Sequence, residues 1–270
     1  MKNDMELIML GTGNAMVTRC YNTCFALKRD ESYFLVDAGG GNGIFRQLEQ
    51  TQIPIENIHH LFVTHAHTDH LLGVIWVVRK IATLMSKGKY VDTLTIYGHN
   101  EVLEALATFC RLTLPKKIVK YIGERIFLCE VRDGDEAEAM DMKLQFFDIV
   151  STKMKQFGFK AILPDGKRLV CLGDEPYNPI CQRYVEQVDW LLAEAFCLYS
   201  ERDIFSPYEK HHSTALDAGK LAEELQVKNL VLYHTEDKNI ADRKERYTAE
   251  AKTVFSGHVF VPNDLERIVL

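Results

Sequence analysis

The sequence predicts an α/β protein in which two β-sheets pack together and are covered by helices. Three observations support this prediction. The chain has 270 residues, of which 47% are hydrophobic, so it can bury a substantial core. Runs with the composition of strands occur near both ends of the chain, and segments with helical spacing lie between them. No internal repeat, low-complexity tract or linker divides the sequence, so we expect a single domain over residues 1–270.

The first third of the chain is predicted to be rich in strands. We expect strands at residues 6–10, 24–27, 33–36 and 58–63, and a short helix at residues 44–50. Glycines at positions 39, 40, 41 and 43 predict a tight loop before that helix. Apolar residues with helical spacing follow residue 70 and predict a second helix, which Thr68 or Asp69 can cap.

Strands and helices alternate in the rest of the chain. The middle is expected to form strands at residues 94–97, 125–131, 144–150, 158–163 and 168–172, with a helix at residues 101–110. The last third is expected to form strands at 190–193 and 230–233 and helices at 214–225 and 241–254. Strands at both ends with helices between them favour two sheets rather than one.

Charge and cysteine content restrict the class of protein. The formal net charge is −6, so bulk electrostatics would not hold a long polyanion. There are 7 cysteines and no CxxC pair, and residues 1–4 do not resemble a secretory signal, which predicts a cytoplasmic protein with reduced thiols. A redox or metal pair formed by Cys20 and Cys24 is the alternative interpretation. No apolar stretch reaches the ~18 residues that a membrane span requires.

Residues 64–70, with the sequence THAHTDH, form the densest group of metal-ligand side chains in the chain. His65, His67, Asp69 and His70 supply three imidazoles and a carboxylate, and three of the ten histidines fall here. Such ligands suit zinc, iron or manganese. Alternate residues of an extended segment point in different directions, so we expect His65 and His67 at one metal and Asp69 and His70 at another.

Further ligands must come from distant parts of the chain. Asp174 follows the expected strand at residues 168–172, and His234 follows the expected strand at 230–233. Residues at strand ends can converge on one edge of a sheet, so these two are the best candidates. A turn or capping role is the alternative for each.

These residues and several further segments resemble one known family. The segment at residues 64–70 resembles the signature of the metallo-β-lactamase superfamily. Five further segments resemble the ribonuclease Z-like branch of that superfamily and occur in the same order along the chain. They are residues 10–15 (LGTGNA), 35–40 (LVDAGG), 173–174 (GD), 212–215 (HSTA) and 230–234 (LVLYH). The resemblance implies the metallo-β-lactamase fold, a four-layer αββα sandwich of two mixed β-sheets flanked by helices.

The resemblance also implies roles for individual residues. Two divalent metal ions are expected, zinc first and iron or manganese as alternatives. His65, His67 and Asp174 would bind one ion, and Asp69, His70, Asp174 and His234 would bind the other. Asp37 would orient ligands by hydrogen bonding. Asp69 and His212 would be the catalytic residues, His212 by assisting the leaving oxygen. His211 is expected at the surface, and His59, His60, His99 and His258 are expected to be structural.

The chain departs from the family pattern in two places. A further metal histidine is usual before a segment such as residues 151–158, and this chain has Val150 there. Valine cannot bind a metal, so we expect the first metal to be held more weakly. Enzymes of this branch that process transfer RNA usually carry a protruding arm, and residues 157–174 are too few to form one. Together with the acidic charge, this argues against transfer RNA as the substrate.

The expected function is hydrolysis of a small anionic ester or nucleotide-type substrate, with a phosphodiester favoured and a metal-bound hydroxide as nucleophile. A homodimer is expected from the resemblance. A lactone or thioester hydrolase is an alternative, because the same chemistry acts on carbonyls. A weakly active protein that uses its metal to bind a ligand is another, motivated by Val150. A nucleotide-binding oxidoreductase, suggested by Gly11-Thr12-Gly13, has little support because Met16 stands where that motif needs a small residue.

Overall fold

The computed structural model of the chain describes residues 5–270. Two compact units make up these residues. The first unit contains the described part of Met1–Gly11, together with Tyr21–Val131 and Asp264–Leu270. The second unit contains Thr12–Cys20 and Arg132–Asn263. Each unit holds one β-sheet and the helices that cover it.

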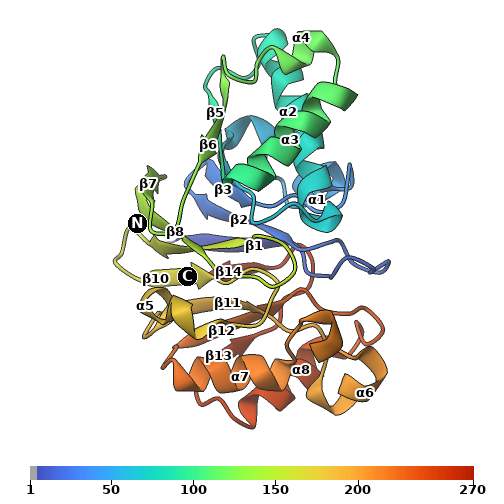
Figure 1. Cartoon of the computed structure of the whole chain (residues 1–270), viewed down its shortest axis with the longest axis vertical. Coiled ribbons are helices and arrows are strands. Elements are labelled where there is room, and N and C mark those ends of the chain that lie inside the picture. The colour runs from blue at the N-terminus through green and yellow to red at the C-terminus, as the bar shows by residue number, and fades with distance from the viewer. Residues whose placement is uncertain (1–4) are drawn as a thin grey trace. The chain divides into compact units, whose positions relative to one another are not determined.

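The sheet of the first unit has seven strands in the order β14-β1-β2-β3-β4-β5-β6 (Figure 1). Its pairs are antiparallel from β14 to β3 and parallel from β3 to β6. The strands are β14 (Arg267–Val269), β1 (Glu6–Gly11), β2 (Cys24–Arg29), β3 (Ser32–Val36), β4 (Ile58–Phe62), β5 (Leu94–Gly98) and β6 (Ile126–Glu130). The sheet is therefore mixed.

Helices cover one face of this sheet (Figure 1). They are α1 (Ile44–Gln50), η1 (Ile55–Asn57), α2 (Thr68–Ser86), α3 (Asn100–Thr113) and α4 (Lys116–Val119). The buried face of α2 packs into the core of the unit through residues such as Val74 and Val78. Near its start α2 comes very close to the loop after β3. The Gly73 N–H donates to the Gly39 carbonyl at 2.8 Å, and a Cβ on Gly73 would lie 1.8 Å from the Ala38 oxygen.

The sheet of the second unit also has seven strands, in the order β13-β12-β11-β10-β9-β8-β7. Its pairs are antiparallel from β7 to β10 and parallel from β10 to β13. The strands are β13 (His258–Phe260), β12 (Asn229–Tyr233), β11 (Trp190–Glu194), β10 (Arg168–Cys171), β9 (Phe157–Ile162), β8 (Met142–Asp148) and β7 (Glu136–Ala139). Both sheets thus combine an antiparallel half with a parallel half.

Two longer helices, α7 (Ala215–Glu224) and α8 (Arg243–Lys252), pack on the second sheet. The start of α7 is fixed by a capping box, in which Thr214 and Asp217 bond each other's backbone N–H groups. The shorter turns of this unit are η2 (Pro179–Cys181), α5 (Gln182–Val185), η3 (Tyr199–Glu201), α6 (Arg202–Phe205) and η4 (Tyr208–Lys210). Within residues 5–270, no helix combines the length and apolarity that a membrane span requires.

The structure confirms the two mixed sheets with helices. It adds edge strands that the sequence did not predict. β7, β13 and β14 are not among the expected strands. β7 has the sequence EAEA, with low strand propensity, and the other two have only three residues each, so neither pattern nor length marks them. The predicted cap of α2 was also wrong. The N-cap residue is His67, and no side chain caps this helix.

Candidate metal centre

The candidate site residues follow the carboxyl ends of parallel strands in both units. In the first unit Asp37 follows β3, and residues 64–70 follow the neighbouring strand β4. In the second unit Asp174 follows β10, Glu194 ends β11 and His234 follows β12. Neighbouring parallel strands end at the same edge of a sheet, which is where α/β proteins usually bind ligands. The sheet pairing therefore brings each unit's polar residues together.

Asp37 organises the histidine segment of the first unit. One carboxylate oxygen accepts from the Thr64 N–H at 2.9 Å, and the other accepts from the Thr64 hydroxyl at 2.7 Å and from Nδ1 of His70 at 2.7 Å. Asp37 is buried and has a φ of +53°, a conformation that costs energy for a residue with a Cβ. Such strain indicates that the surrounding contacts fix this carboxylate in place.

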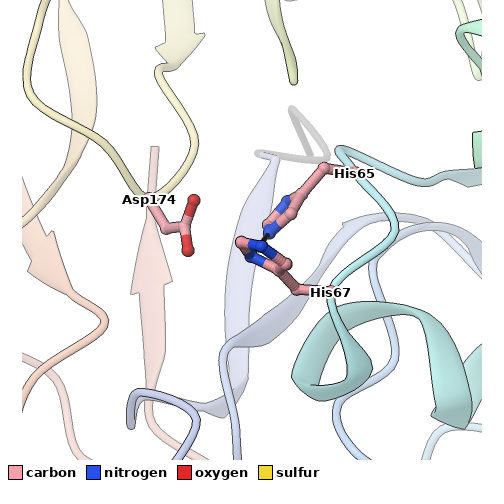
Figure 2. A group of neighbouring side chains, drawn as sticks. All are labelled: His65, His67 and Asp174. Atoms are coloured by element: carbon pink, nitrogen blue, oxygen red, sulfur yellow. Dashed lines mark hydrogen bonds between the residues drawn. The ribbon is translucent and has the colours of Figure 1, made fainter. Parts of the chain in front are cut away.

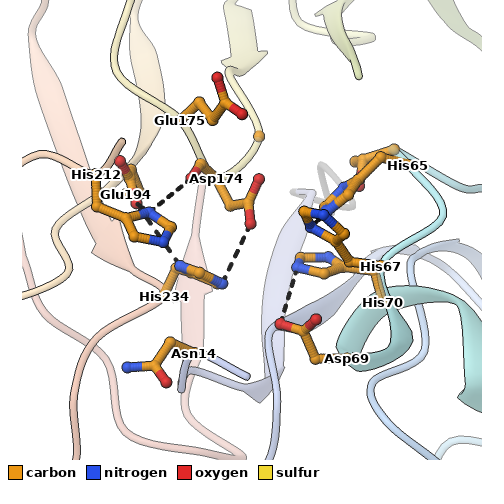
Figure 3. A network of polar contacts seen from close by, with 12 residues as sticks. Asn14, His65, His67, Asp69, His70, Asp174, Glu175, Glu194, His212 and His234 are labelled. Atoms are coloured by element: carbon orange, nitrogen blue, oxygen red, sulfur yellow. Dashed lines mark hydrogen bonds and ion pairs between the residues drawn. The ribbon is translucent and has the colours of Figure 1, made fainter. Parts of the chain in front are cut away.

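His70 presents its other ring nitrogen to a ligand. Because Nδ1 donates to Asp37, Nε2 is the nitrogen that carries the lone pair when the ring is neutral, and it lies 3.4 Å from Oδ2 of Asp69 (Figure 3). Burial lowers the pKa of His70, but the carboxylates of Asp69 and Asp37 outweigh this effect and raise the pKa well above 6.5. The histidine thus lies in a negative environment that also favours a metal cation.

His65 is oriented in the same way, through Thr64. The Thr64 hydroxyl gives its proton to Asp37, so its oxygen accepts from Nδ1 of His65 at 2.9 Å. This leaves Nε2 of His65 as the ring nitrogen with a lone pair, and it lies 2.8 Å from Nδ1 of His67 (Figure 2). Two ring nitrogens at that distance share a proton, and a single cation could take its place. The pair is therefore suited to binding one metal ion.

The second unit has its own group of candidate ligand side chains (Figure 3). Nε2 of His234 lies 3.4 Å from Oδ2 of Asp174, and Nδ1 of His234 lies 3.6 Å from Oε2 of Glu194. Nδ1 of His212 contacts the same Glu194 oxygen at 2.7 Å and the Asp174 carbonyl at 3.0 Å. Asp174, Glu194 and His234 are buried, and His234 has a φ of +58°. One ligand atom each from Glu194, His212 and His234 lies within 4.8 Å of the others.

His212 is held by contacts to one ring nitrogen and to one face of its ring. Its Nδ1 must carry the proton, because both contacts of that atom are oxygen acceptors. Phe196 stacks on the ring with an interplanar angle of 9° and fixes its plane. Nε2 lies 3.4 Å from Nζ of Lys153, an exposed residue. This arrangement is suited to exchanging a proton at Nε2.

The donor atoms of both groups fit divalent metals. They are imidazole nitrogens and carboxylate oxygens, the ligands that zinc, iron and manganese use in proteins. The second unit buries the carboxylates of Asp174, Glu175 and Glu194, and buried negative charge is costly unless a cation offsets it. Nδ1 of His65 and Nδ1 of His70 are hydrogen-bonded, as is usual for the ring nitrogen of a metal-bound histidine that does not contact the metal.

Sequence reasoning missed Glu194, Thr64 and Gln156. Glu194 ends the apolar strand β11, so the strand-end rule that selected Asp174 and His234 could have selected it. The other histidines are not members of these groups. His99 caps α3, His59 contacts Tyr90, and His211 and His258 are exposed.

Residues 5–260 match the protein family described as anti-Pycsar protein Apyc1. The chain belongs to the anti-Pycsar protein Apyc1 family. It is also 26% identical to a ribonuclease Z from Thermobifida fusca over 307 aligned residues, which cover 98% of this chain and 94% of that protein. The alignment is longer than this 270-residue chain, so that relative contains residues that this family member lacks.

Two solved structures show the fold of this Apyc1 family member. The metallo-β-lactamase fold protein YhfI from Bacillus subtilis matches with a TM-score of 0.80 and 20% identity, covering 98% of this chain and 99% of that one. Human tRNase Z, short form, matches with a TM-score of 0.74 and 19% identity, covering 97% and 98%. The chain therefore has the metallo-β-lactamase fold and is a metal-dependent hydrolase of the ribonuclease Z-like type, as the sequence predicted.

Proposed function

We propose that the protein is a phosphodiesterase whose metal centre is built from ligands of both units, which together form one functional domain. The first unit supplies His65, His67, Asp69 and His70, and the second supplies Asp174 and His234. In this proposal His65, His67 and Asp174 hold one divalent ion, and Asp69, His70, Asp174 and His234 hold the other. Zinc fits this ligand set best, with iron and manganese as alternatives. Divalent metals at such a site activate water and neutralise charge on phosphoryl oxygens.

The observation that carries the proposal is the role of Asp37. Through one carboxylate it fixes both His65 and His70 with Nε2 as the ligand atom, directly in one case and through Thr64 in the other. A buried, strained aspartate that orients two imidazoles serves no purpose in packing alone. It is the support that metal-binding histidines require.

His212 and Glu194 supply the proton-transfer part of the proposal. Glu194 accepts from Nδ1 of His212 and holds the ring, so Nε2 can give a proton to the departing alkoxide. Phe196 keeps the ring from rotating away. The carboxylate also stabilises the imidazolium form, which must exist before the proton is released. Asp69 contributes as a metal ligand and as the negative neighbour of His70.

The favoured substrate is a small phosphodiester of nucleotide type. Two divalent ions with only two carboxylates, Asp69 and Asp174, among their direct ligands would attract phosphoryl oxygens, although the whole chain has a net charge of −6. β9 and β10 are joined by a short turn between Ile162 and Arg168, so this hairpin provides no arm for a long RNA. Transfer RNA is therefore disfavoured. A homodimer is part of the proposal, and its mass in solution tests it.

The test measures the metal content per chain and the rate of hydrolysis on the same protein samples. Metal per chain is determined by atomic emission, and hydrolysis is followed with bis(p-nitrophenyl) phosphate, a dinucleotide, a lactone, a thioester and a transfer-RNA precursor. We expect metal-dependent hydrolysis of the first two. His67→Ala and His234→Ala, one from each unit, should both lose metal and activity.

His258→Ala is the matched control, because this histidine is exposed on β13. It should keep full metal content and rate. A metal-loaded wild-type protein that leaves both phosphodiesters intact would refute the proposed function. If His67→Ala lowered metal binding and His234→Ala did not, the function would survive but the shared metal centre would not.

A further inference from the structure

Val150, in the loop between β8 and β9, is exposed, whereas Asp174, Glu194 and His234 of the second unit are buried. The loop is closed at its base by a hydrogen bond from the Ile149 N–H to the Gln156 carbonyl at 3.1 Å. Val150 is 47% exposed and has a φ of +56°, and its N–H donates to Oδ1 of Asp148 at 2.8 Å. The position where the family resemblance expects a metal histidine thus carries an exposed side chain.

Gln156, at the other end of the same loop, reaches Asp174 instead. Its side chain is 1% exposed, and its Nε2 donates a hydrogen bond to Oδ1 of Asp174. Gly173 makes room for this amide. It has a φ of +87°, and a Cβ at this position would lie 2.9 Å from Cδ of Gln156. The backbone before Asp174 is therefore shaped around the glutamine side chain.

The two oxygens of Asp174 consequently have different surroundings. Oδ1 receives the amide proton of Gln156, whereas Oδ2 lies 3.4 Å from Nε2 of His234. A carboxylate that bridges two metals offers one oxygen to each. The amide shares Oδ1 and is a neutral group, so it orients the carboxylate without adding the ligand that an imidazole would add.

We propose that Gln156 is a positioning residue that holds Asp174 in place of the missing histidine, and that the two metals consequently bind with unequal affinity. This inference rests on the proposed metal centre. The ion assigned to Asp69, His70 and His234 would be the tight one. The ion assigned to His65 and His67 would be the weaker and exchangeable one.

Zinc binding to the purified full chain tests the inference without any activity measurement. Stepwise dissociation constants are obtained by competition with a chromogenic chelator, and bound zinc is counted after dialysis against zinc buffers. The wild type should show two steps separated by about tenfold or more. Gln156→Leu, which keeps the volume but removes the donor, should weaken zinc binding by about 10–100-fold, the usual effect of losing a group that orients a ligand.

A matched pair of histidine variants distinguishes the role inferred for Gln156 from the sequence-based expectation that the missing metal histidine belongs at Val150. Gln156→His places an imidazole beside Asp174 and should tighten the weaker step by at least tenfold. Val150→His places the same group on the exposed side of the loop and should leave both steps unchanged. This comparison remains decisive even if Gln156→Leu does not fold.

Each outcome has a distinct meaning. Three results would overturn the inference while leaving the proposed function intact. They are two equally tight zinc ions in the wild type, unchanged zinc binding in Gln156→Leu, or tighter zinc binding in Val150→His rather than in Gln156→His. A wild-type chain that binds neither zinc, iron nor manganese would remove both.

Discussion

The carboxylate of Asp37 accepts a hydrogen bond from Nδ1 of His70 at 2.7 Å, and both side chains are buried. The same oxygen receives the Thr64 hydroxyl, which in turn accepts from His65. One carboxylate thus sets which nitrogen two histidines present. The orientation of the ligands in the first unit depends on this residue, although it need not touch a metal itself.

Asp37→Asn should weaken zinc binding by about 10–100-fold, because the amide removes the negative charge that supports two imidazoles. The dissociation constants of the purified variant measure this effect. Asp92→Asn, which changes an exposed aspartate of the same unit, should bind zinc like the wild type. Equal affinities for the Asp37 and Asp92 variants would contradict the role assigned to Asp37.

Glu194→Gln should slow the hydrolysis of substrates with poor leaving groups most. The glutamine keeps the hydrogen bond to His212 but loses the charge that stabilises the imidazolium, so proton donation weakens. We expect kcat for a dinucleotide to fall by about 100-fold, and kcat for bis(p-nitrophenyl) phosphate to fall far less, because p-nitrophenolate departs without a proton. Glu224→Gln, on the exposed side of α7, is the control. An equal loss on both substrates would mean that Glu194 serves only the metal or the fold.

Lys153→Ala should raise KM for an anionic substrate more than it lowers kcat. Lys153 is exposed, and its Nζ lies 3.4 Å from Nε2 of His212, where the substrate phosphate would approach. We expect KM to rise about fivefold at low salt, and less at high salt because screening already weakens an exposed charge. Lys155, in the same loop, lies over the Phe157 ring, so Lys155→Ala should have little effect on KM. A similar KM increase in both variants would indicate general charge rather than a phosphate contact.

Gly73→Ala should destabilise the first unit. Its Cβ would lie 1.8 Å from the Ala38 carbonyl oxygen, so α2 would have to move away from the loop that carries Asp37. Overpacking of this kind costs about 1–3 kcal/mol in unfolding free energy. Denaturant unfolding measures the loss, with Ser86→Ala at the exposed end of α2 as the control. Because the displaced loop holds Asp37, zinc affinity should fall in the same variant.

Buried thiols should make the protein less stable at alkaline pH. Burial raises the pKa of Cys110 to about 12, that of Cys181 to about 11 and that of Cys197 to about 12, from an ordinary 9.0. Above pH 9 the unfolded chain releases these protons while the folded chain keeps them, so folding stability falls as pH rises from 9 towards 12. Unfolding free energies at pH 8 and pH 10 should show this loss, and Cys110→Ala should reduce it. A pH-independent free energy over this range would contradict the prediction.

The metallo-β-lactamase superfamily and most of the fold could be predicted because their signals are local. The segment at residues 64–70 places four ligand side chains within six residues, and strands such as β4 and helices such as α2 have clear periodicity. Asp174 and His234 could be chosen because each directly follows an apolar strand. These features depend only on neighbouring residues, so the sequence contains them in full.

The contacts that refine the site could not be read from the sequence, because they depend on strand pairing. Glu194 lies beside β12, with Tyr233 as its partner in the parallel register, and this places its carboxylate within 3.6 Å of His234. Gln156 reaches Asp174 because β9 pairs with β10 and the loop before it closes on Ile149. By itself the sequence therefore determined the ligand types and their strands. Only the tertiary structure decided that Gln156, rather than Val150, supports Asp174, since hydrogen bonds between distant residues form only once the sheet register is fixed.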